Sequence, residues 1–203
     1  MNGTGRVRKQ QLSDQSSDSD LLRLSGNGNE DAFLLLYRRH QGAVFRFALH
    51  MSGSPEIAEE VTQEVFLAML AEKQRYIAER GSLECYLIGV ARNHVRRQLR
   101  AVRPVAAEQR EAVASQLPKA GILDELCKKQ ELRALQIAIL RLPPKYREVV
   151  ALCDLEGLSY AQAAQQLTCS VGTVRSRLHR ARNLLEAKFR RDEKLRMREG
   201  CSV

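Results

Sequence analysis

A capped helix, a short polar break and a second, basic helix follow one another between residues 158 and 189. Ser159 stands where a helix N-cap belongs, and Gln162 lies three residues on as its capping-box partner. After the break at 168–170, apolar residues recur at spacings of four, three and four, namely Val174, Leu178, Ala181 and Leu185. The pattern predicts two helices joined by a tight turn.

The face of the second helix opposite that apolar stripe is polar and mostly basic. It carries Arg175, Ser176, His179, Arg180, Arg182 and Asn183. Such a face beside a tight turn is typical of a helix-turn-helix, whose second helix enters the major groove of DNA. A merely solvated face is the alternative, but the cap, the turn, the small alanines and the basic helix all agree with DNA binding.

The composition of the chain favours a polyanionic partner and argues against a membrane span and a metal site. The formal net charge of +9 favours a polyanionic partner. No apolar run approaches the roughly 20 residues that span a bilayer, and residues 1–11 lack the apolar core of a signal peptide, so we expect a cytoplasmic protein. The five cysteines form no CxxC pair and lie near no histidine at zinc-ligand spacing. We therefore expect no metal site. The four histidines stand beside no recognisable serine or cysteine nucleophile, and there is no glycine-rich phosphate loop, so we also expect no cofactor, small-molecule substrate or enzymatic activity.

Apolar periodicity is helical wherever it is clear, and no strand alternation is visible, so the expected fold is all-α. Two small helical domains are predicted, joined by a flexible linker, with the C-terminal one a helix-turn-helix. The expected boundaries are a disordered lead-in at 1–19, a helical domain at 20–103, a linker at 104–122, a helix-turn-helix domain at 123–190 and a charged, fraying tail at 191–203.

Two helices of the first domain have polar faces that packing does not explain. In the helix that begins at Pro55, the apolar stripe leaves Glu60, Gln63 and Glu64 outside. The helix over about 83–102 becomes strongly basic toward its end, with more arginines than the helix dipole calls for, which favours phosphate contact. Its polar residues away from the core are Arg92, Asn93, Arg96, Arg97 and Arg100.

Two separate stretches resemble one family. The first comprises NEDAFLLLYRRH, AEEVTQEVFLAML and GSLECYLIGVARNHVRRQLR, and the second is LPPKYREVVALCDLEGLSYAQAAQQLTCSVGTVRSRLHRAR. In this order they are similar to regions two and four of the extracytoplasmic-function (group 4) sigma factors of bacterial RNA polymerase, in the sigma-70 family. The ordered pair is much more specific than either stretch alone.

The resemblance implies a promoter-specifying subunit that binds core RNA polymerase and promoter DNA. Glu60, Gln63 and Glu64 match the positions that bind the clamp helices of the largest subunit, and region four would meet the flap of the second. The family is often controlled by an anti-sigma factor, frequently membrane-bound, which would hold the chain at the inner membrane face.

The resemblance also implies a division of the DNA contacts. Asn93 matches the family's asparagine at the pocket for a flipped minus-ten base, and an amide can pair with a base edge in either sense. The neighbouring Arg92, Arg96, Arg97 and Arg100 would hold phosphates. The minus-thirty-five duplex would be read by Arg175, Ser176, His179 and Arg180, with Thr173 near a phosphate.

The chain departs from the family pattern at two positions. Tyr86, just before Leu87, stands at the position where the family usually has tryptophan. Glu60 stands at the position where the family usually has aspartate. An ordinary helix-turn-helix regulator, with a ligand-binding or dimerisation domain as its first half, is the alternative. A regulator of that kind does not require the 81–100 segment or the exposed glutamates. Unlike a sigma factor, it would bind duplex DNA tightly on its own.

Overall fold

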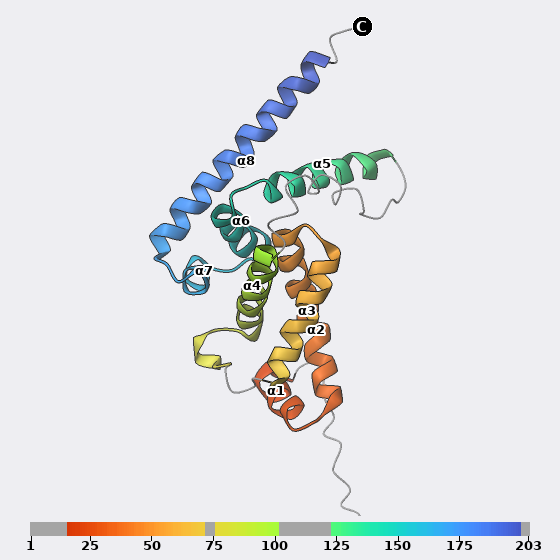
Figure 1. Ribbon diagram of the computed structural model, residues 1–203, viewed down its shortest axis with the longest axis vertical. Coiled ribbons are helices and arrows are strands. Elements are labelled where there is room, and N and C mark those ends of the chain that lie inside the picture. The colour runs from red at the N-terminus through yellow and green to blue at the C-terminus, as the bar shows by residue number, and fades with distance from the viewer. Residues whose placement is uncertain (1–15, 72–75, 102–122, 200–203) are drawn as a thin grey trace, which may run out of the picture.

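The computed structural model describes residues 16–71, 76–101 and 123–199, and within them the regular structure is helical, as predicted (Figure 1). The elements in chain order are α1 (Asp18–Gly26), α2 (Glu30–Ser52), α3 (Pro55–Ala71), the 3₁₀ turn η2 (Ala78–Arg80), α4 (Leu83–Ala101), α5 (Leu123–Leu140), α6 (Pro144–Val150), the π-helical turn η5 (Ala151–Leu155), α7 (Tyr160–Leu167) and α8 (Val171–Glu199).

Helices α1 to α4 pack into one bundle around fully buried side chains such as Leu36, Phe47 and Val65. Gly53 ends α2 in the left-handed conformation, with φ of 76°, which glycine adopts without steric cost. Helix α1 starts two residues earlier than Asp20, where the predicted domain begins. Ser17 accepts a hydrogen bond from the backbone of Asp20, and Asp18 binds side chains of α2.

Helices α5 to α8 form the C-terminal half, and its helix-turn-helix has the predicted local structure. The capping box of Ser159 and Gln162 is present in both directions, and Thr168 ends α7 with φ of 52°. Helix α8 does not stop near residue 190 but continues to Glu199, projecting from the body of the molecule (Figure 1). Glu186 and Arg190, one turn apart, form an ion pair that supports this exposed part of the helix.

The two halves pack against each other. Helix α2 contacts both α5 and η5, and the C-terminal end of α4 lies beside α6 (Figure 1). At Gly53 the approach is so close that a Cβ atom would lie 2.8 Å from Leu140 on α5. The predicted linker at 104–122 and residues 1–15 of the predicted lead-in lie outside the described residues. The flexibility of the linker and the disorder of the lead-in therefore stay predictions.

Candidate nucleic-acid interface

The N-terminal turns of α8 present a polar, basic face to solvent. Ser170 accepts a hydrogen bond from the backbone N–H of Thr173 at 3.1 Å, so the helix begins on a side-chain cap. Thr173 is half-buried, whereas the four residues predicted to read bases are exposed, namely Arg175, Ser176, His179 and Arg180. The structure therefore brings these predicted residues together on one accessible face.

Aromatic and acidic neighbours orient the arginines of α8. The Arg175 guanidinium lies over the Tyr160 ring, 5.9 Å from its centroid. Arg180 hydrogen-bonds with Tyr146, and this bond lowers the pKa of the tyrosine hydroxyl. Arg182 forms a bidentate ion pair with Asp154: Nη2 donates to Oδ1 at 2.6 Å and Nε donates to Oδ2 at 3.2 Å. This pairing raises the pKa of Arg182. Arg182 thus fastens α8 to η5, while Arg175 and Arg180 remain at the exposed face.

The five polar residues predicted on α4 do not form one free surface. Asn93 and Arg100 are exposed. Arg97 donates to Glu64 of α3 at 3.1 Å. Arg92 and Arg96 instead face α6 of the other half, where both pair with a single carboxylate. Sequence reasoning identified the helix and its charge, but it could not tell which arginines already have a partner within the chain.

Helix α3 exposes a row of side chains one turn apart. Glu60 and Gln63 are exposed as predicted, but Glu64 is half-buried and hydrogen-bonds to His94 Nδ1 as well as Arg97. Leu67 follows on the same face and is 66% exposed, the highest value among the large apolar side chains of the described residues. The sequence analysis did not identify Leu67 as a candidate. Its position outside the apolar stripe of α3 would have indicated that it is exposed.

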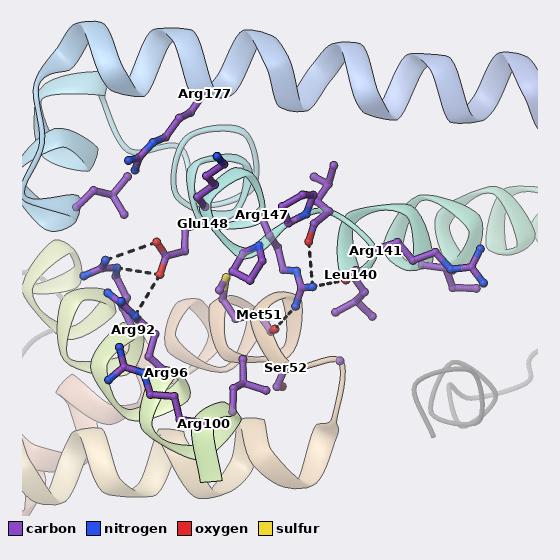
Figure 2. A pocket seen from close by; sticks show the side chains of 18 residues that line it. Met51, Ser52, Arg92, Arg96, Arg100, Leu140, Arg141, Arg147, Glu148 and Arg177 are labelled. Atoms are coloured by element: carbon purple, nitrogen blue, oxygen red, sulfur yellow. Dashed lines mark hydrogen bonds and ion pairs between the residues drawn. The ribbon is translucent and has the colours of Figure 1, made fainter. Parts of the chain in front are cut away.

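A groove of about 920 Å³ runs between the two halves (Figure 2). Its apolar lining includes Leu99, Ile137 and Leu140. Its cationic lining comes from both halves, from Arg92, Arg96 and Arg100 of α4 and from Arg141, Lys145, Arg147 and Arg177. Glu148 is the carboxylate among the lining residues. A mixed apolar and cationic groove of this kind suits an amphipathic, acidic chain segment better than a neutral ligand.

A buried arginine joins the two halves beside this groove. The Arg147 guanidinium donates to the backbone carbonyl of Met51 at 2.8 Å, to that of Leu142 at 3.2 Å and to that of Leu140 (Figure 2). Met51 lies in the last turn of α2, and Leu140 ends α5. One side chain therefore satisfies carbonyls at the ends of two helices, which would otherwise lack partners.

Over 16–71, 76–101 and 123–199, no helix is both long and apolar enough to cross a membrane. Within the same ranges, no three His, Cys, Asp or Glu side chains gather closely enough to hold a metal ion.

Comparison with known proteins finds matches to both halves. Residues 36–104 match the family model described as Sigma-70 region 2, and residues 132–185 match that of Sigma-70, region 4. The ECF RNA polymerase sigma factor SigC of Mycobacterium tuberculosis is 32% identical over 182 residues, covering 89% of this chain and 96% of SigC.

Two further likenesses extend this result. SigE of Mycolicibacterium smegmatis, also an ECF sigma factor, is 36% identical over 155 residues; the match covers 74% of this chain but only 58% of SigE. Among solved structures, the Bartonella quintana sigma factor RpoE, in complex with the anti-sigma factor NepR, is 25% identical with a TM-score of 0.60. That match covers 78% of this chain and 96% of the solved one.

Proposed function

We propose that this chain, which belongs to the extracytoplasmic-function sigma factors of the sigma-70 family, selects promoters by reading upstream duplex with α8 and capturing an unpaired minus-ten base beside α4. The family's function is to direct transcription initiation by RNA polymerase, and it is not catalytic. The observation that carries the proposal is the exposed face of α8, where Arg175 and Arg180 stand oriented by Tyr160 and Tyr146.

Reading the minus-thirty-five element requires side chains that reach base edges from a helix in the major groove. Arginine can pair with guanine through two hydrogen bonds, and each such pair discriminates by about 1–3 kcal/mol. Arg175 and Arg180 are the candidates for this contact, with Ser176 and His179 between them on the same exposed face. Thr173, in the first turn of α8, is the proposed phosphate contact at the helix N-terminus.

Capture of a minus-ten base would occur near the middle of α4. Asn93 is exposed there, and its amide can donate to and accept from a base edge. The Tyr86 ring lies 5.8 Å from that of Tyr76, and the Tyr76 hydroxyl donates to the Gly81 carbonyl. This aromatic pair supports the segment just before α4. Its Tyr86 ring stands at the position where the family usually has tryptophan.

Asn93→Ala is expected to slow promoter opening about tenfold, because a lost hydrogen bond to a flipped base is worth about 1–2 kcal/mol. The measurement is permanganate reactivity of minus-ten thymines in complexes with core polymerase. Gln98→Ala, which removes another amide from α4, is the matched control and should leave reactivity unchanged. Equal opening by the Asn93 variant and the native chain would remove Asn93 from the base pocket.

The polymerase-binding face proposed here is the row Glu60, Gln63 and Leu67 on α3, with Glu64 at its edge. An exposed leucine flanked by acidic and amide side chains suits a basic partner surface with an apolar centre. Glu64 is already held by His94 and Arg97, so it positions α3 against α4 as well as contributing charge. The flap of the second subunit remains the proposed partner of the C-terminal half.

Gln63→Ala combined with Leu67→Ala is expected to weaken binding to core polymerase about tenfold or more, because a buried apolar contact at an interface centre dominates its energy. Binding is measured by fluorescence anisotropy of the labelled chain titrated with core enzyme. Leu132→Ala removes an exposed leucine from α5 instead and serves as the control. Unaltered affinity of the double variant would place the polymerase contact elsewhere.

An anti-sigma factor is the proposed inhibitory partner. The interdomain groove supports this, because its apolar residues and cationic rim suit an acidic amphipathic segment. The likeness to a sigma factor solved with its anti-sigma factor points the same way. As a polymerase subunit the chain would act in the cytoplasm, and a membrane-anchored inhibitor would hold it at the inner membrane face.

A further inference from the structure

We infer that the chain inhibits itself without any partner, through a latch in which Glu148 of α6 occupies the place of a DNA phosphate on Arg92 and Arg96 of α4. The inference rests on the proposed role of these two arginines in holding the minus-ten strand. The interdomain latch is defined here as Arg92, Arg96 and Glu148, together with Gln166 of α7.

The Arg92–Glu148 ion pair of the latch is largely shielded from water, whereas the Arg96 side chain is 43% exposed. Glu148 Oε1 lies 3.3 Å from Arg92 Nε and 3.7 Å from Arg96 Nε, and Glu148 Oε2 lies 3.5 Å from Arg92 Nη2 (Figure 2). The side chains of Arg92 and Glu148 are only 12% and 10% exposed. Charges this buried are screened far less than surface ion pairs, so their attraction persists at cellular ionic strength.

Two hydrogen bonds to backbone carbonyls close the latch on its other side. Arg92 Nη1 donates to the Gln166 carbonyl at 3.0 Å, near the negative end of the α7 dipole. The Gln166 side chain donates in turn to the Cys85 carbonyl at 2.9 Å. It lies so close to α4 that a Cβ atom added at Gly89 would be 2.2 Å from Gln166 Oε1. A side chain at Gly89 would therefore displace the Gln166 amide from its position against α4.

The carboxylate of Glu148 offers arginine what a phosphate offers, namely two anionic oxygens that accept guanidinium hydrogen bonds. DNA phosphates and Glu148 therefore compete for Arg92 and Arg96, and both cannot be bound at once. Binding of the minus-ten strand requires α6 and α7 to leave α4. The apparent affinity of the free chain for single-stranded DNA is reduced by the fraction of molecules that are closed.

Two variants of the full chain open the latch by different means. Glu148→Gln removes the charge that holds the arginines. Gly89→Ala changes no charge and suits a helix, but its methyl group displaces Gln166 from Cys85. The control Glu186→Gln also removes one negative charge, from an exposed ion pair on α8 remote from the latch. Each protein is examined by solution X-ray scattering and by anisotropy with fluorescent single-stranded oligodeoxythymidine.

Both latch variants are expected to show a larger radius of gyration than the native chain and to bind the oligonucleotide about fivefold or more tightly, whereas Glu186→Gln should match the native chain in both. An unchanged radius in both variants overturns the latch. Equal gains in affinity from Glu148→Gln and Glu186→Gln, with none from Gly89→Ala, would also overturn it, because charge alone would explain them. A larger radius without tighter binding would overturn the autoinhibition by disproving the phosphate role of Arg92 and Arg96.

Discussion

Arg147→Met is expected to lower the free energy of unfolding by about 3 kcal/mol, because the backbone carbonyls of Met51, Leu140 and Leu142 each lose a guanidinium donor. Buried acceptors left without partners bear the full cost of their desolvation, and methionine fills the space without offering a donor. For a chain of this length the melting temperature should fall by roughly 6–12 °C.

The measurement for Arg147→Met is thermal unfolding followed by circular dichroism and calorimetry. Arg191→Met provides the matched control, since Arg191 is an exposed arginine on α8. Surface substitutions of that kind usually change stability by less than about 0.5 kcal/mol. A melting temperature for Arg147→Met equal to that of the control would show that these hydrogen bonds contribute nothing to the joined fold.

Arg175→Ala combined with Arg180→Ala is expected to reduce transcription from a promoter of this sigma factor about a hundredfold. Each arginine paired with a base edge contributes about 1–3 kcal/mol of recognition, and the double variant loses both. The fold should be unaffected, because both side chains lie on the exposed face of α8, whereas the Arg182–Asp154 pair that fastens the helix is retained.

The readout for this double variant is the yield of promoter-dependent transcripts made with core polymerase. Arg190→Ala with Arg191→Ala removes the same charge from exposed positions further along α8 and should retain most of the activity. If both double variants lost activity equally, α8 would bind DNA through charge alone and the proposed recognition face would be wrong.

Local signals were enough to predict most of the helices. Ser159 and Gln162 form the predicted capping box, and Pro55 begins a helix as predicted, because such residues act within a few positions along the chain. The clustering of the polar residues on α8 followed from helical periodicity in the same way. The far extension of α8 was missed, because its charged sequence has no apolar stripe to mark a packed helix.

The packing of the two halves was not predicted, because it depends on contacts between residues far apart in sequence. Arg147 and Glu148 stand next to each other in a short helix and read as ordinary polar positions, although both are buried at the junction. Helix periodicity marks an apolar face but cannot say which arginine will meet which carboxylate. The roles of Asn93 and Glu60 in binding stay predictions for the same reason.

We propose that this chain directs polymerase to promoters through two separate DNA contacts. The most direct test of this proposal is transcription of genomic fragments by the purified chain with sigma-free core polymerase, followed by mapping of the transcripts' 5′ ends. Start sites that share two upstream elements at constant spacing are expected, and Arg175→Ala with Arg180→Ala should abolish dependence on the farther one. Start sites without a shared pair of elements, or no transcripts despite tight duplex binding by the chain alone, would contradict it.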